Sequence, residues 1–200
     1  MRVPLLWCTN SRLMLAVAAA AILALPGCSM NVKKGDNGED KKVDINTPLG
    51  GIHVNSEADV RDTGLPVYPG ARPKKKESND HDEKNANVDI SSFGFSLKVV
   101  AVEYESDDPP AKLIAFYQDK LKKFGNVLEC HTEERHYGFS HSSDSHDSKN
   151  LKCESDSNGK NVELKVGSED NQRIVSIQPE AKGSTFALVY VRTKGKEGSI

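Results

Sequence analysis

One apolar run near the amino terminus constrains this chain most, because it separates a leader from the part that must fold. The run extends from Leu13 to Leu25, and the residues before it include Arg2 and Arg12 but no acid. A helix of thirteen residues is about 20 Å long, shorter than the roughly 30 Å hydrocarbon core of a bilayer. The pattern therefore predicts a secretory signal peptide at residues 1–27 and excludes a permanent membrane-spanning helix.

The leader ends in the tetrapeptide Leu25-Pro26-Gly27-Cys28. This motif resembles the lipobox of bacterial lipoproteins, and the resemblance covers residues 1–29. It implies that the Cys28 thiol receives a diacylglycerol, that the preceding peptide bond is cut, and that the new amine is acylated. Ser29 resembles the residue that lets such proteins reach the outer membrane. The resemblance thus implies a covalent lipid and a periplasmic-face anchor, with an ordinary cleaved signal peptide as the alternative.

Composition favours one domain in the mature chain and argues against one class of partner. Removing residues 1–27 from 200 leaves 173, and removing two leader arginines from 27 basic residues leaves 25 against 29 acids. The resulting acidic balance argues against a nucleic-acid partner. Residues 28–42, polar apart from Met30 and Val32, are expected to form a flexible tether. The remainder, 43–200, is expected to be one domain with disordered loops near 72–87 and 134–150.

The number of cysteines left in the mature chain predicts a disulfide. Cys8 leaves with the leader and Cys28 is taken by lipid, so Cys130 and Cys153 are the thiols left in an oxidising compartment. Closing this loop would stabilise the fold by roughly 3 kcal/mol on the chain-entropy model. A pair of metal-binding or redox thiols is the alternative, although no Cys-x-x-Cys spacing supports it.

A histidine-rich loop is the clearest candidate for a functional site, as a set of metal ligands. Imidazole and carboxylate groups are good ligands for Zn or Cu. A five-residue step between histidines suits neither a helix face nor one side of a strand, so a plain polar loop is the favoured interpretation. The candidate ligands are His131, His136, His141, His146, Asp144 and Asp147.

Local patterns predict one helix and an amino-terminal hairpin. Alternating apolar residues on either side of the turn at 47–51 predict a β-hairpin from Val43 to Val54. Pro110 is the expected first residue of an amphipathic helix, because Pro109 precedes another proline and should avoid the α region. The helix is expected to end at Gly125. Its predicted apolar face is Leu113, Ile114, Tyr117, Leu121 and Phe124.

The remaining periodic segments predict strands, with a turn at Asn158-Gly159. An antiparallel sheet covered by one amphipathic helix is an α+β fold, so the expected class is α+β with an extra amino-terminal hairpin. The expected strands include Val88 to Ile90, Phe93 to Val102, Val127 to Glu133, Leu151 to Ser155, Val162 to Val166, Ile174 to Pro179 and Thr185 to Val191.

Two further patterns bear on function. The segment Gly64 to Ala71 resembles a stretch of uncharacterised bacterial envelope proteins, and Tyr68 in it is expected to pack on the core, with ligand contact as the alternative. No hydrolase elbow, zinc-protease motif, phosphate loop or dinucleotide fingerprint occurs in the sequence. We therefore expect no enzyme, but a periplasmic lipoprotein that binds a small ligand or envelope protein or supports envelope structure. A metal-binding lipoprotein using loop 131–147 is the alternative.

Overall fold

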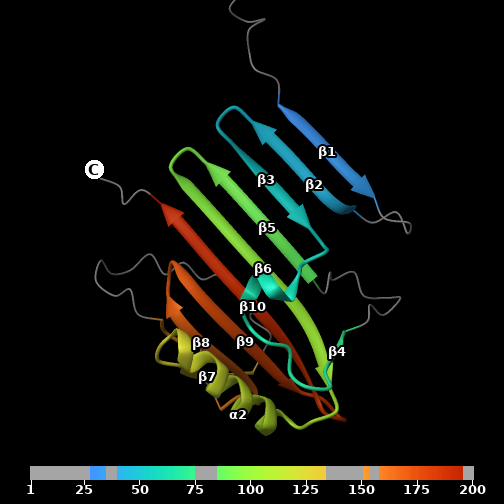
Figure 1. Ribbon diagram of the computed structural model, residues 1–200, viewed down its shortest axis with the longest axis vertical. Coiled ribbons are helices and arrows are strands. Elements are labelled where there is room, and N and C mark those ends of the chain that lie inside the picture. The colour runs from blue at the N-terminus through green and yellow to red at the C-terminus, as the bar shows by residue number, and fades with distance from the viewer. Residues whose placement is uncertain (1–27, 35–39, 75–84, 134–150, 154–157, 196–200) are drawn as a thin grey trace, which may run out of the picture.

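A single antiparallel sheet dominates the structure, a computed structural model of the chain. The structure describes residues 28–34, 40–74, 85–133, 151–153 and 158–195. Strands account for 57% of the described chain (Figure 1). Each strand pairs antiparallel with its neighbours. Some neighbours are consecutive in the chain and form hairpins, and the others are joined by longer connections.

Ten strands form the sheet in the spatial order β1-β2-β3-β5-β6-β10-β9-β8-β7, with the short β4 beside β6. The two edges are therefore an amino-terminal strand and the strand that follows the helix. The strands are β1 (Ser29–Lys34), β2 (Asp40–Thr47), β3 (Gly50–Asn55), β4 (Arg72–Pro73), β5 (Asn85–Ser92), β6 (Phe95–Ser106), β7 (Leu128–Thr132), β8 (Asn161–Ser168), β9 (Asn171–Pro179) and β10 (Ser184–Gly195).

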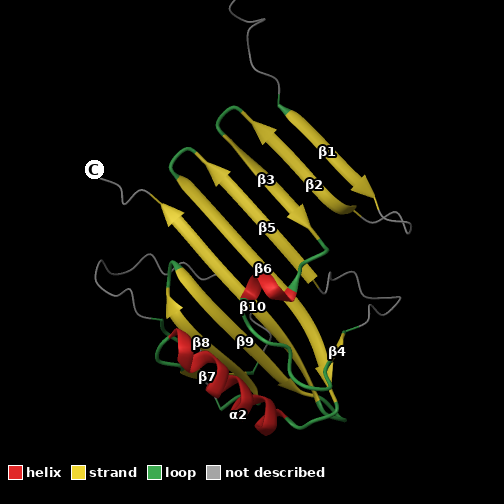
Figure 2. Cartoon of the chain, viewed as in Figure 1, coloured by secondary structure: helices red, strands yellow, loops and turns green. Residues whose placement is uncertain are grey.

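The prediction of an α+β fold is wrong, because the sheet outweighs the helical part. Helix α2 (Pro110–Leu121) continues into the 3-10 turn η2 (Lys122–Phe124) and packs on β8 and β9 (Figure 2). A second 3-10 turn, η1 (Val60–Thr63), packs on β6 and β10. The predicted hairpin is present as β2–β3, but it is no separate addition, because β3 pairs with β5 and extends the same sheet.

The helix follows its sequence signals closely. Pro110 is its first residue, as predicted, and the extended Pro109 precedes it. The predicted apolar face is confirmed, since Leu113, Tyr117 and Leu121 have no exposed surface. The proline at its start and the apolar periodicity therefore predict this element, and the sheet beneath it supplies the burial that stabilises it.

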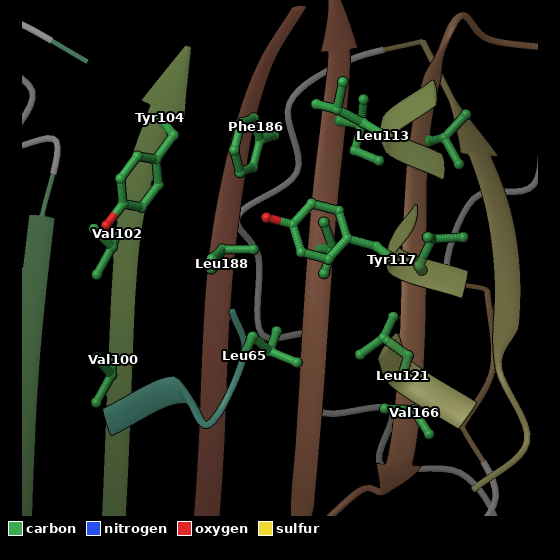
Figure 3. Packing of buried hydrophobic residues seen from close by; sticks show 14 residues of the cluster. Leu65, Val100, Val102, Tyr104, Leu113, Tyr117, Leu121, Val166, Phe186 and Leu188 are labelled. Atoms are coloured by element: carbon green, nitrogen blue, oxygen red, sulfur yellow. The ribbon is translucent and has the colours of Figure 1, made fainter. Parts of the chain in front are cut away.

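The core lies between α2, the η1 segment and one face of strands β6, β10, β9 and β8 (Figure 3). Tyr117 points from the helix into this layer, with its ring centroid 5.7 Å from that of Phe186. Its hydroxyl donates to the Pro66 carbonyl at 3.2 Å, which ties the loop after η1 to the helix. Leu65 fills the space beside Leu188 in the same layer.

The amino-terminal half of the sheet has a second apolar face. Residues that pair across antiparallel strands share a face, so the register assigns side chains to faces directly. One cross-strand row on this face consists entirely of valines: Val32, Val43, Val54, Val88 and Val99. The next row along the opposite face is polar, with Asp44 beside His53 and Asp89 beside Lys98.

Three local expectations differ from the structure. Residues 29–34, expected in a flexible tether, form β1, because β2 offers its backbone groups to an extended chain in which Met30 and Val32 alternate with polar residues. Arg72–Pro73, expected within a disordered loop, forms β4 on β6. Leu151 to Cys153 is not a strand, and β7 pairs instead with β8. Asn158-Gly159 accordingly precedes β8 without turning a hairpin.

Candidate anchoring site

Cys28, the predicted lipidation site, lies exposed at the start of the edge strand β1. Ser29 pairs with Asn46, which places Cys28 beside the turn that joins β2 to β3. The cysteine bears a free thiol and precedes the first paired residue of the strand. Its sulfur is therefore accessible at the margin of the sheet.

The predicted disulfide between Cys130 and Cys153 is confirmed. The two Cα atoms are 5.5 Å apart, within the usual range for a disulfide, and Cys130 on β7 is buried. The bridge does not join adjacent strands, because residues 151–153 have no strand pairing. It attaches this segment to the edge strand β7, at the far side of the sheet from β1.

The predicted metal ligands are only partly within the described chain. His131 lies on β7, and its Nε2 is 3.2 Å from Oε1 of Glu129. Across the described ranges, no three His, Cys, Asp or Glu side chains gather so that they could hold a metal ion. The metal site therefore stays a prediction. The other predicted ligands lie outside the described residues: His136, His141, His146, Asp144 and Asp147.

An ionic cluster at the start of α2 went unnoticed in the sequence. The Arg72 guanidinium donates to both carboxylate oxygens of Asp107, each at 2.9 Å. Asp108 accepts a bond from Lys112 at 2.7 Å and one from the Tyr68 hydroxyl at 2.8 Å. The two aspartates therefore connect β4 and the loop before it to the helix. Only an acid pair before a proline signalled this cluster, and two of its partners, Tyr68 and Arg72, are far away in sequence.

Tyr68 packs as the sequence predicted. Its ring meets Phe116 edge-on, with centroids 5.2 Å apart. Burial and the bond to Asp108 raise the pKa of its phenol. The residue joins the loop to α2 through both its ring and its hydroxyl, which is a structural role.

We expect the aspartate at the helix start to make stability depend on pH. Bonds from Lys112 and then Tyr68 lower the pKa of Asp108 below its ordinary 3.8. A lowered folded-state pKa adds stability above the unfolded pKa, and that stability is lost as the pH falls through the folded value. Urea unfolding should therefore show Asp108→Asn less stable than wild type at pH 7, with the difference shrinking below about pH 4. Tyr68→Phe, which keeps Asp108 and Lys112, should retain most of the pH dependence. A difference independent of pH would contradict the assignment.

Arg173 is a second residue that the sequence did not single out. Its guanidinium carbon lies 3.9 Å from the ring centroid of Phe124 and 4.9 Å from that of Tyr190. Its Nε donates to the Thr63 carbonyl at 3.0 Å. The side chain thus joins η1, η2 and the sheet, which explains a charged residue beside the core.

A shallow hollow lies at the end of α2, with a volume of about 610 Å³. Within it the Gln118 amide donates to Glu129 at 2.6 Å. The hollow is open to solvent, and its charged groups are Lys122 and Glu129. The arrangement offers hydrogen bonds to a polar ligand.

Comparisons with protein-family models, with curated proteins and with solved structures found no match to this chain. Within the described residues, no helix is long and apolar enough to cross a bilayer.

Proposed function

We propose that this chain is a lipid-anchored protein of the bacterial cell envelope, held by acyl chains on Cys28 at the periplasmic face of the outer membrane. The observation that carries the proposal is the position of this exposed thiol, at the start of an edge strand and directly after a leader that resembles a lipoprotein signal. Acyl chains there displace no packed side chain. Two or more chains, at about 0.8 kcal/mol per buried methylene, hold a protein firmly on a bilayer.

The domain itself serves a non-catalytic role: it binds a small ligand or another envelope protein, or it supports envelope structure. Its architecture favours this role, because α2 covers only part of one face of a ten-stranded sheet. Exposed apolar surface on a sheet suits contact with a partner. The hollow beside Gln118 and Glu129 offers a second place where a polar group could bind.

The anchor is tested by intact-mass measurement of the protein isolated from cell envelopes. The wild type should carry a diacylglycerol and a further acyl chain on a chain that begins at Cys28. Cys28→Ala should lose that mass and accumulate as the longer precursor. Cys8→Ala, which removes the other cysteine before the proposed cleavage point, should keep the lipid. A Cys28→Ala product with the same lipid mass as wild type would refute the anchor.

A further inference from the structure

Exposed apolar side chains gather in one region of the described chain. They occupy β1, β3, the start of β6, and the turns that join β2 to β3 and β5 to β6. Phe93, in the second of these turns, is 87% exposed. A positive φ of 85° at Gly94 lets the chain turn tightly there and projects this tip outward. The large hydrophobic residues in this exposed group are Met30, Val32, Leu49, Ile52, Phe93 and Phe95.

The register joins the strand members of this group into a continuous surface. A second cross-strand row lies beside the valine row on the same face, and it too is apolar from β1 to β6. Five strands about 4.8 Å apart and two such rows about 7 Å apart give a footprint of roughly 340 Å². Continuous apolar patches of a few hundred Å² are often functional on soluble proteins. The row is Met30, Ile45, Ile52, Ile90 and Leu97.

No described element packs over this face. Among the described parts of the chain, β1, β2, β3 and β5 make substantial contacts only with their neighbours in the sheet. Helix α2 packs on β8 and β9 (Figure 2). The turn η1 packs on β6 and β10, on the opposite face, where Val100 and Val102 belong to the core. The two rows therefore differ from the core face of β8 and β9, where α2 buries the apolar side chains.

The most exposed end of this face carries almost no charge. The ranges 28–32, 46–52 and 90–97 contain no Asp, Glu, Lys or Arg, in a chain of which 28% is charged. The pairings of Ser29 with Asn46 and of Gly50 with Ser92 align these ranges at one end of the sheet. Cys28 lies at the same end, beside Ser29, and the start of β1 and both turns face the same way in Figure 1.

We infer that this apolar face rests on the lipid bilayer, with the turn residues Leu49 and Phe93 at its leading end. The inference rests on the proposed lipid anchor and adds an orientation to it. Acyl chains on Cys28 bring the start of β1 to the headgroups, so the apolar medium nearest to Met30 is the membrane itself. Aromatic and aliphatic side chains without nearby acids are the composition that enters a membrane interface. The polar face with Asp44 and His53 then points away from the lipid.

Tryptophan probes test the orientation in the mature, lipidated protein. Trp7, the sole tryptophan of the chain, belongs to the leader that the mature protein lacks, so each introduced probe is unique. The probes are Phe93→Trp and Ile52→Trp. Asn46→Trp serves as a control on the polar face, and Ala181→Trp as a control at the opposite end of the sheet. Each protein is reconstituted in phosphatidylethanolamine–phosphatidylglycerol vesicles with and without brominated acyl chains, which quench tryptophan on contact.

We expect a blue shift and loss of fluorescence in brominated vesicles for Phe93→Trp and Ile52→Trp, and neither effect for the two controls. Equal quenching of all four probes, or of none, would overturn the inference. A blue shift that brominated lipid leaves unquenched, together with crosslinked dimers, would assign the face to a second copy and also overturn it.

The intact mass of the same samples distinguishes a failure of this inference from a failure of the proposed lipid anchor. Quenching at positions 93 and 52 with an unmodified Cys28 would support the membrane-facing surface and refute the lipid. A lipidated Cys28 without selective quenching would refute the surface and leave the anchor standing.

Discussion

Tyr117→Ala should destabilise the domain by about 3–5 kcal/mol, the usual cost of deleting a buried aromatic ring. Tyr117 has no exposed surface, and its ring lies 5.0 Å from Phe116 and 5.7 Å from Phe186, centroid to centroid. The truncation leaves a cavity between α2 and the sheet and removes the bond to the Pro66 carbonyl. Domains of this size have a total stability of about 5–15 kcal/mol, so much of the protein could unfold. Urea unfolding followed by circular dichroism measures the loss.

Tyr117→Phe is the matched control, because it keeps the ring and removes only the hydroxyl. Its cost should be about 1 kcal/mol, the net value of one hydrogen bond. An exposed aromatic gives a second control: Phe93→Ala should leave the unfolding free energy nearly unchanged, since Phe93 is 87% exposed. Tyr117→Ala with wild-type stability would show that α2 does not pack on the sheet as described.

Removing the disulfide should lower the unfolding free energy by about 3 kcal/mol, from the loop-closure entropy of the unfolded chain. The bridge spans a sequence separation of 23 and holds residues 151–153 to the edge strand β7. The double variant Cys130→Ala with Cys153→Ala suits the test, because Cys130 is buried and serine would bury a hydroxyl there. Denaturant unfolding of the oxidised wild type and of the variant gives the difference.

Reductant provides the internal control for the disulfide. Dithiothreitol should lower the stability of the wild type toward that of the double variant and leave the variant itself unchanged. Thiol labelling of native protein should find Cys130 and Cys153 unreactive until reductant is added. Equal stability of wild type and variant without reductant would contradict a stabilising role.

Elements set by near neighbours in the chain could be predicted from sequence. Pro110 fixed the start of α2, and the spacing of Leu113 and Tyr117 fixed its buried face. The β2–β3 hairpin followed from alternation on both sides of a turn. The disulfide followed from counting cysteines. These features depend on a few adjacent residues or on simple arithmetic.

Of the candidate anchoring site and the apolar face beside it, only Cys28 could be predicted from the sequence. The motif before Cys28 singles it out in the sequence, but the apolar rows beside it depend on which strands pair. Val32 and Val99 are far apart in the chain and share a face only because β2, β3 and β5 lie between β1 and β6. Alternation of side chains along a strand gives the strand two faces, but it does not indicate which face another element covers.

The amino-acid pattern alone predicted the helix, the paired cysteines and most of the strands, because each reflects local sterics, periodicity or composition. The leader stays a prediction. Long-range pairing settled the rest. Hydrogen bonds from β2 turned an expected tether into β1, and pairing of β3 with β5 merged an expected separate hairpin into one sheet. Backbone hydrogen bonds between strands carry almost no sequence signature, so which strands meet, and thus the fold class, follows from the folding of the whole chain.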